Sequence, residues 1–389
     1  MRLPGGIHRT TAGGKERGSM HNFIFHQGTK IVFGGGCVKE YLASFVQEYG
    51  PNVLLASGEH SAQYSGIYAE VRQTLQRAGK QVVEFSGIRP GPDYAAVQRG
   101  ARLAREQRVD LVLGVGGGSV LDCCKAAAMA AVYPGDLWAD FWARRGGVDF
   151  HPLPVGAIPT TVGAGGLNGT MVLTHGALGA RRGRDYPQCA PRFALLDPAY
   201  TRSLSRDQVI AGGFDAFSRA MELYFAPPEG ETVSDDLLEA LMRGLIRALR
   251  TSSKDLQNDD ARSDLMWAGT LAGDKLFRLG KRCTYPCRRA ALQLMEHTRH
   301  SRTDCLAVLQ LAACRRVCIE QPARAARLAR RVWEASGPTE QALAQAGTEA
   351  LSSFLQELGL PSRLEDLGLE QTALPPQSAQ GKNLWVYTA

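Results

Sequence analysis

The chain has 389 residues and a mass of 42.1 kDa, with 44% apolar and 21% charged residues. This length fits one or two domains, and the composition is that of an ordinary globular protein, which excludes a disordered, collagen-like or coiled-coil chain. The sequence contains no apolar run long enough for a membrane span, and residues 1–19 lack the apolar core of a secretory signal. We therefore expect a cytoplasmic protein that does not bind membranes.

The net charge of +7 is concentrated in two short stretches. Residues 1–19 carry four basic residues and one acidic residue, and residues 278–302 carry seven basic residues and one acidic residue. The rest of the chain is slightly acidic, so the charge predicts no general surface for nucleic acid. Nine cysteines without an export signal indicate reduced thiols.

Regular patterns begin at Met20, and we interpret residues 1–19 as a leader or a cloning remnant. Residues 20–195 alternate short apolar runs with amphipathic segments, which predicts an α/β domain with a parallel sheet. The expected strands are 30–33, 52–57, 81–85 and 110–115, and the expected helices are 38–49, 66–78 and 94–107.

After residue 195 the strand pattern stops and apolar residues recur at spacings of three and four. The helices expected there are 206–225, 234–251, 261–279, 304–319, 322–335 and 340–358. Residues 196–389 are therefore predicted to form an all-α domain, and a ligand is expected in the cleft between the two domains.

The strongest local motif is Gly116-Gly117-Gly118-Ser119, which follows an apolar strand and opens a helix. Glycines allow a diphosphate to approach the main chain, and the first N–H groups of the helix would face it. A tight turn in which Ser119 and Asp122 form a capping box is the structural alternative. The residues alone leave these two interpretations equally open.

Several motifs in register resemble the iron-containing (group III) alcohol dehydrogenases, in particular the butanol dehydrogenase and aldehyde reductase branch. The motifs are GVGGGSVLD at 114–122, IPTT at 158–161, LLDP at 195–198 and AGGFDAFSRAMELYF at 211–225. The resemblance implies an N-terminal dinucleotide-binding domain, a C-terminal helical metal and substrate domain, and NAD(P)-dependent interconversion of a primary alcohol and an aldehyde. It also suggests a homodimer.

The resemblance also assigns cofactor-binding residues. It places the pyrophosphate on Gly116, Gly117, Gly118 and Ser119, with Asp122 supporting the loop, Thr160 and Thr161 lining the nucleotide site, and Glu59 and Ser61 in the loop that contacts the ribose. An acidic Glu59 would accept hydrogen bonds from a 2′-hydroxyl and repel a 2′-phosphate, which favours NAD over NADP. A solvated loop glutamate is the alternative.

The metal site departs from the family pattern. The family holds a divalent metal, iron or zinc, through one aspartate and three histidines. The aspartate corresponds to Asp215, but Arg219, Arg288 and Arg302 stand at the histidine positions, and Leu292 replaces a further histidine near the substrate. A guanidinium has no lone pair to donate, so we expect that the metal is not bound.

Three explanations of this departure stay open. In the first, the arginines and Asp215 form a cationic pocket that binds or reduces an anionic substrate without metal. In the second, the chain is an inactive nucleotide-binding paralogue. In the third, residues 278–302 and the end 375–389 are incorrectly translated. The bunched arginines and cysteines and a break in apolar periodicity at 278–302 fit the third, and the sequence leaves the three explanations equally open.

Three local alternatives also stay open. His297 and His300 could restore part of a metal site. Four cysteines could form a structural zinc site, although buried thiols usually pack as apolar groups; they are Cys283, Cys287, Cys314 and Cys318. Asp215 and Arg219 could form only an ordinary ion pair along one helix.

Overall fold

The computed structural model describes residues 20–59, 66–163, 166–228, 231–298 and 300–369. Four of the sequence-based interpretations fall on other residues: the leader at 1–19, the ribose contact of Ser61, and the unusual end at 375–389 lie outside the described residues, as does the side chain of His297.

The N-terminal half is built on a six-stranded parallel sheet with the order β1-β8-β5-β4-β2-β3. The four strands expected from the sequence are present, and β5 and β8 complete the sheet. The strands are β1 (Lys30–Phe33), β2 (Asn52–Gly58), β3 (Gln81–Ile88), β4 (Leu111–Gly116), β5 (Val155–Pro159) and β8 (Phe193–Leu196). Strands β4, β5 and β8 are buried along their whole length, because helices cover both faces of the sheet.

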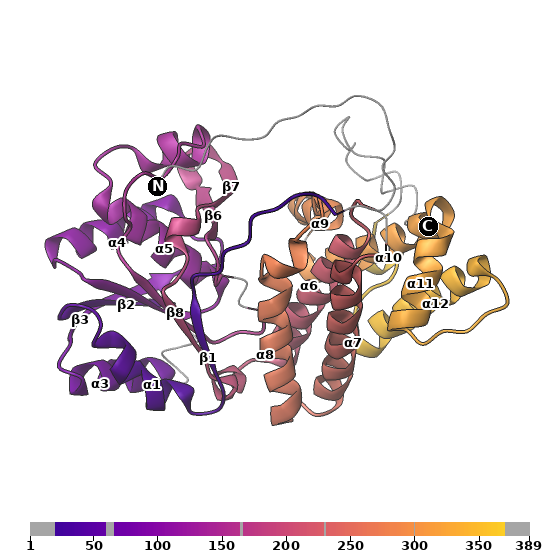
Figure 1. The fold of residues 1–389 in the computed structure, drawn as a ribbon, viewed down its shortest axis with the longest axis horizontal. Coiled ribbons are helices and arrows are strands. Elements are labelled where there is room, and N and C mark those ends of the chain that lie inside the picture. Colours follow the sequence, from indigo (N-terminus) through magenta and orange to yellow (C-terminus); the bar gives the residue numbers. More distant parts are fainter. Residues whose placement is uncertain (1–19, 60–65, 164–165, 229–230, 299, 370–389) are drawn as a thin grey trace.

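Two pairs of helices cover the sheet (Figure 1). The first pair, α1 (Cys37–Val46) and α3 (Ile67–Arg77), packs its apolar side on one face, and the second pair, α4 (Tyr94–Glu106) and α5 (Gly118–Val132), packs on the other. A two-stranded antiparallel hairpin, β6 (Thr170–His175) and β7 (Ala180–Asp185), lies beside α5. The predicted α/β architecture with a parallel sheet is confirmed.

The C-terminal half is helical, as predicted. Its helices are α6 (Arg206–Tyr224), α7 (Val233–Lys254), α8 (Asp259–Gly273), α9 (Pro286–His297), α10 (Arg302–Glu320), α11 (Pro322–Val332) and α12 (Glu340–Leu358). Capping boxes begin α6, α7 and α10 at Ser205, Thr232 and Ser301, so side chains satisfy the first N–H groups of these helices. The apolar faces meet in one core around Phe214, Phe217 and Leu245.

Two expectations for this half were wrong. The helix expected at 261–279 ends at Gly273, and a separate 3-10 turn follows at Leu276–Arg278. Helix α9 was not expected, because residues 278–302 seemed to lack periodicity. In fact Cys287, Ala290, Ala291 and Leu294 are buried at helical spacing and pack into the C-terminal core.

The two halves meet through glycines. An ideal Cβ added to Gly269 of α8 would lie 2.5 Å from the Cα of Gly163, which follows β5. One added to Gly212 of α6 would lie 2.8 Å from the carbonyl oxygen of Val162. These close backbone contacts hold the start of α6 against the carboxyl end of β5.

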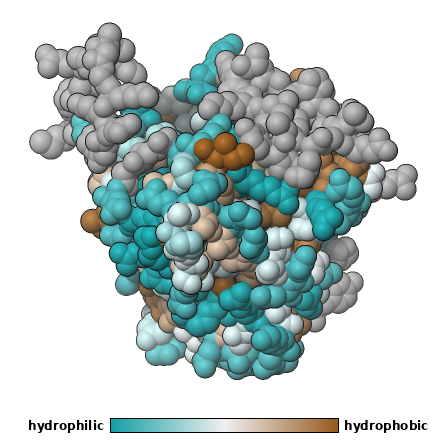
Figure 2. Space-filling view, turned by 90° about the vertical axis from the view of Figure 1, so that its right-hand side faces the viewer, coloured by the Kyte–Doolittle hydropathy of each residue, from teal (hydrophilic) through white to brown (hydrophobic). Residues whose placement is uncertain are grey.

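The outer face formed by the C-terminal helices is mostly hydrophilic, with small apolar areas between the polar ones (Figure 2). Among the described residues, no helix combines the length and apolar character that crossing a membrane requires.

Candidate active site

The glycine loop lies where the order of the strands reverses. The chain runs from β2 outward to β3 and then returns to β4 on the other side of β2, and the helices that follow β2 and β4 cover opposite faces of the sheet. Such a switch point is the usual ligand site of a parallel sheet. Gly116 ends β4, and α5 begins at Gly118, so the first N–H groups of α5 open toward this crevice.

The three glycines of the loop have different surroundings. Gly116 has a φ of +155°, and a Cβ there would lie 2.7 Å from Val120. A Cβ on Gly117 would lie 3.2 Å from the methyl group of Thr161. A Cβ on Gly118 would meet nothing within 4 Å. Packing therefore explains Gly116 and Gly117, whereas Gly118 borders open space that a phosphate group could enter.

The other loop residues expected near the cofactor take distinct roles. Ser119 accepts a hydrogen bond from the backbone N–H of Gly91 at 3.1 Å, and Thr160 is buried with its N–H directed to the carbonyl of Gly116 at 3.2 Å. Asp122 accepts from the N–H of Val172 at 3.0 Å and forms an ion pair with Lys125 at 3.2 Å. Asp122 thus ties α5 to β6.

Glu59, at the end of β2, forms an ion pair with Arg89, whose Nε lies 2.7 Å from a carboxylate oxygen. This ion pair raises the pKa of Arg89 through the hydrogen bond and the charge of Glu59. The acidic side chain at the expected ribose position is therefore paired with a cation. This cation, Arg89, was not among the residues predicted from the sequence.

On the helical side, three arginines converge on one carboxylate. Arg288 Nη1 lies 2.7 Å and Arg302 Nη2 2.9 Å from Oδ1 of Asp215, while Arg219 Nη2 lies 3.6 Å from Oδ2. Arg288 also donates to the backbone carbonyl of Asp215 at 3.1 Å. We call Arg219, Arg288 and Arg302 the arginine cluster. Asp215 and Arg219 thus belong to a larger group than a simple ion pair on one helix.

Three helices bring the arginine cluster together. Asp215 and Arg219 lie one turn apart on α6, Arg288 lies in the first turn of α9, and Arg302 is the first residue of α10. Asp215 is also one turn from Gly212, which contacts Val162 just after Thr160 and Thr161. The cluster therefore lies close to the carboxyl ends of the strands.

The charges of the cluster act strongly on one another. Burial alone would raise the pKa of Asp215, but the three guanidinium groups, Arg288 foremost, hold it well below its ordinary value. Burial and then the neighbouring guanidinium of Arg288 lower the pKa of Arg219. For Arg288 burial lowers the pKa, but the charge of Asp215, the hydrogen bond to Asp215 and the charge of Glu222 together exceed this effect and raise it. Asp215 is thus a permanent anion within an excess of cations.

A second carboxyl group, that of Glu222, holds the start of the helix that carries Arg288. One oxygen of Glu222 accepts from the N–H of Cys287 at 2.7 Å and lies 3.5 Å from that of Arg288, so Glu222 fixes the start of α9. Its other oxygen is buried with no hydrogen-bond partner among the described residues. Burial raises the pKa of Glu222 to about 7. The sequence analysis missed this residue.

The donors present do not fit a divalent metal. Guanidinium groups have no lone pair to give, and a single carboxylate does not hold such an ion. Among the described residues, no group of three or more His, Cys, Asp and Glu side chains is placed to bind a metal. We therefore derive no step through a metal.

The four cysteines do not form a metal site among the described residues, whereas the alternative with His297 and His300 stays a prediction because the side chain of His297 is not described. Cys283 and Cys287 bond to the carbonyls of Glu222 and Leu309, whereas Cys314 and Cys318 both contact Thr348. The two cysteine pairs are thus in separate surroundings. His300 directs Nε2 to the carbonyl of Leu367 at 2.9 Å.

Arg181, on β7, connects the two sides of the site. A Cβ added to Gly91 would lie 3.7 Å from Nη1 of Arg181, and Gly91 is the residue bonded to Ser119 of the glycine loop. Arg181 also contributes to lowering the pKa of Arg302, after burial and the guanidinium groups of Arg288 and Arg219. Sequence reasoning missed Arg181 because β7 shows no apolar pattern.

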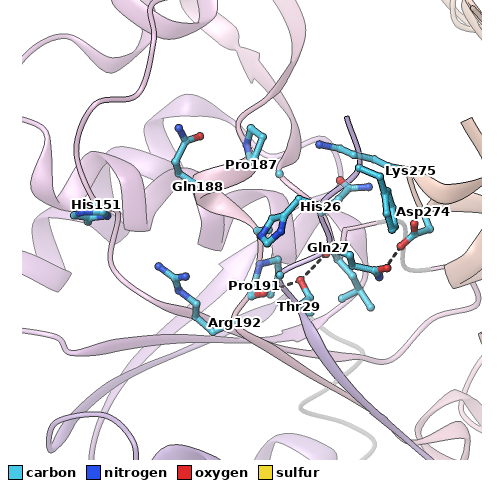
Figure 3. A pocket seen from close by; sticks show the side chains of 16 residues that line it. His26, Gln27, Thr29, His151, Pro187, Gln188, Pro191, Arg192, Asp274 and Lys275 are labelled. Carbon is cyan, nitrogen blue, oxygen red and sulfur yellow. Dashed lines mark hydrogen bonds between the residues drawn. The ribbon is translucent and has the colours of Figure 1, made fainter. Parts of the chain in front are cut away.

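The pocket drawn in Figure 3, of about 420 Å³, lies elsewhere. It is lined by residues that precede β1 and β8, including Thr29 and Arg192, so it lies at the amino ends of these strands. His26 and Arg192 are among the side chains that line it (Figure 3). The glycine loop is at the carboxyl ends, and this pocket therefore contains none of the expected site residues.

Comparison with known proteins agrees with this architecture. The iron-containing alcohol dehydrogenase family matches residues 28–198, and the C-terminal part of the Fe-containing alcohol dehydrogenase family matches residues 209–381. The chain is 34% identical over 363 residues to a probable NADH-dependent butanol dehydrogenase of Bacillus subtilis (91% of this chain, 92% of that protein). It is 31% identical to an NADPH-dependent aldehyde reductase of Escherichia coli (92% of each).

The solved structure of an NADH-dependent butanol dehydrogenase from Thermotoga maritima superposes with a TM-score of 0.82 at 29% identity, covering 91% of this chain and 89% of that one. A parallel sheet with a glycine loop at its switch point, packed on a helical domain, defines a dinucleotide-binding fold. The chain belongs to the iron-containing alcohol dehydrogenase family, in its butanol dehydrogenase and aldehyde reductase branch.

Proposed function

We propose that this chain interconverts a primary alcohol and an aldehyde with NAD(P), and that the arginine cluster takes the place of the metal. The observation that carries this proposal is the convergence of three guanidinium groups on Asp215, at the positions that the family resemblance assigns to metal-binding histidines. The cluster lies one helical turn from the contact between α6 and the residues after β5.

The residues around the switch point fit a dinucleotide. Gly118 leaves open space at the start of α5, Ser119 and Thr160 fix the loop on either side, and Glu59 stands at the end of β2. These residues would hold the pyrophosphate and the ribose. The bound reduced nicotinamide supplies the hydride that reduces the carbonyl carbon. We assign NAD as the preferred cofactor because Glu59 is acidic, and NADP as the weaker one.

We assign the polarisation of the carbonyl to Arg219. Its guanidinium is the most weakly held of the three, at 3.6 Å from Asp215, so its donors are the least committed. Two N–H groups directed at the carbonyl oxygen stabilise the negative charge that develops there as the carbon accepts hydride. A permanently protonated guanidinium does not release a proton. Water, which reaches these partly exposed side chains, gives the proton to the oxygen.

The proposal is tested on the purified full chain. Calorimetric titration with NADH and NADPH measures cofactor binding, elemental analysis measures bound iron, zinc and nickel, and NADH oxidation is followed with butanal. We expect cofactor binding and turnover that a chelator does not abolish. Stoichiometric metal with chelator-sensitive turnover would contradict the arginine role. Cofactor binding without turnover of any aldehyde tested would favour the inactive nucleotide-binding paralogue.

A further inference from the structure

The arginine cluster and Arg181 carry more positive charge than the nearby carboxyl groups neutralise. Four guanidinium groups act on one another here, and the carboxyl groups that act on them are Asp215 and Glu222. Asp215 is ionised, whereas burial keeps Glu222 largely protonated below about pH 7. An excess of cations of this kind is stable only where solvent or an anion compensates it.

Several donors in this group are also uncommitted. The Nε of Arg302 is buried and has no hydrogen-bond partner among the described residues. Arg302 Nη2 forms an ion pair with Asp215 at 2.9 Å, and Arg219 Nη2 lies 3.6 Å from Asp215, beyond hydrogen-bond distance. Guanidinium forks match the two oxygens of a carboxylate. The arrangement thus offers paired donors to an incoming anion.

Arg181 places this anion site beside the cofactor loop. Arg181 lies against Gly91, whose N–H bonds to Ser119, and its charge reaches Arg302. A molecule held between Arg181 and Arg302 would therefore lie between the glycine loop and the arginine cluster. That is where a substrate must lie if its carbonyl is to face Arg219.

We propose that Arg302 and Arg181 bind a carboxylate carried by the substrate, so that the chain acts on short aldehydes and alcohols with a carboxylate at the other end. This inference rests on the proposed function for the reaction itself, although the anion site is testable without turnover. A phosphate of the dinucleotide offers similar chemistry, and the test below separates the two sources.

The first experiment uses the unmodified full chain and unreactive probes. Succinate and 1,4-butanediol have the same number of carbons, but only succinate is charged. We expect calorimetry in the presence of saturating NADH to give at least about tenfold tighter binding of succinate, since paired charge-assisted hydrogen bonds are lost in the diol. Equal or absent binding of the two probes would overturn the anion site, whatever the result with butanal.

The second experiment assigns the residues. Arg302→Gln and Arg181→Gln should each weaken succinate binding about tenfold or more and leave NADH binding unchanged. Two control variants remove the same charge and should leave the binding of both ligands unchanged. Arg289→Gln lies on α9 next to Arg288, with an exposed side chain, and Arg182→Gln lies next to Arg181 on β7, where Arg182 donates to the carbonyl of Trp142. Thermal unfolding checks that each variant is folded.

The outcomes separate the proposals. If Arg302→Gln weakens NADH binding instead of succinate binding, the cluster binds a phosphate of the cofactor and the inference is wrong. If succinate binds as expected while no aldehyde is reduced, the result contradicts the proposed reaction and supports the anion site. If butanal is reduced but succinate does not bind, the result supports the reaction and contradicts the anion site. Because Arg181 lies on an exposed hairpin, its variant tests the inference even if Arg302→Gln fails to fold.

Discussion

The two sides of the candidate site keep very different amounts of the family's pattern. On the sheet side, the glycine loop, the threonines after β5 and the ion pair of Asp122 with Lys125 form a complete arrangement. On the helical side, the one expected carboxylate remains and arginines surround it. The difference lies in what each site requires of its residues.

A phosphate site made of backbone N–H groups needs only the correct turn and the absence of a Cβ, and the fold itself supplies both. A metal site needs lone pairs from particular side chains, and these can be lost while the helices stay in place. Arg219, Arg288 and Arg302 are accommodated because Asp215 pairs with all three. The cluster therefore depends on Asp215 far more than the glycine loop depends on any one side chain.

The largest effect should follow when this carboxylate is removed. Asp215→Asn leaves three buried or partly buried cations without their anion, and we expect the free energy of unfolding to fall by about 3 kcal/mol at pH 7. Because the pKa of Asp215 is lowered in the folded state, this contribution is present at neutral pH and is lost as the pH falls through the acid range. Urea denaturation at pH 7 and at acid pH measures the loss of stability and its dependence on pH.

Asp259→Asn is the matched control for the loss of one carboxylate. Asp259 pairs with Arg202 at 2.5 Å, but both side chains are exposed, so little stability should be lost. If the two substitutions lower the free energy of unfolding by the same amount, Asp215 does not hold the cluster together.

The next effect concerns Glu222. Its pKa is raised from the ordinary value of 4.5 to about 7, so between these pH values the folded chain keeps a proton that the unfolded chain releases. Stability should therefore decrease as the pH rises from about 4.5 to 7. Glu222→Gln removes this loss and should make the variant more stable than the parent by roughly 2–3 kcal/mol at pH 8, with little difference at pH 4.5.

Denaturation curves at the two pH values measure this effect. Glu349→Gln, on the exposed surface of α12, provides the control for removing a carboxyl group. A stability difference for Glu222→Gln that does not change with pH would show that Glu222 is ionised throughout.

A smaller effect tests the sheet side. Gly118→Ala adds a Cβ that meets no protein atom, so stability should stay the same or rise by up to about 1 kcal/mol. NADH affinity should nevertheless fall about tenfold, because the Cβ enters the space left for the pyrophosphate. Gly244→Ala, inside α7 and equally free of contacts, should have the same effect on stability and none on NADH. Unchanged NADH binding in both variants would place the cofactor elsewhere.

The smallest effect concerns the choice of cofactor. Glu59→Gly removes the acceptor for a 2′-hydroxyl and releases Arg89, which is then able to pair with a 2′-phosphate. We expect the ratio of NADP to NAD affinity to rise a few-fold. Adding Arg89→Gln should cancel that rise. An unchanged ratio in Glu59→Gly would reject the role of Glu59 at the ribose.

Much of the fold was predictable because buried strands and amphipathic helices have clear periods. Helix α9 was missed because its buried positions hold Cys287, Ala290 and Ala291, whose weak apolar signal lies among arginines. The hairpin strand β7 was missed because its sequence, ARRGRD, has no apolar alternation. Helix α9 carries Arg288 and strand β7 carries Arg181, so both missed elements contribute charged residues to the candidate site. Charged residues of this kind weaken the apolar pattern from which helices and strands are predicted.

The convergence of Arg219, Arg288 and Arg302 on Asp215 was one of three explanations drawn from the family register, and no local pattern in the sequence relates α6 to α9 and α10. Glu222 carried a signal that was overlooked: it is an acidic residue on the buried face of α6, seven positions after Asp215. Arg181 carried none, because a cation on a polar hairpin resembles any surface arginine. Only the folded chain shows that Arg181 lies beside Gly91 and that its charge acts on Arg302.

The contact between Gly163 and Gly269 makes the separation of the two halves depend on a missing side chain. A Cβ at Gly269 would lie 2.5 Å from the Cα of Gly163, so there is no room for a side chain at this point. Any larger residue at position 269 would have to move α8 away from the residues that follow β5, and it would thereby change the spacing between the two sides of the site.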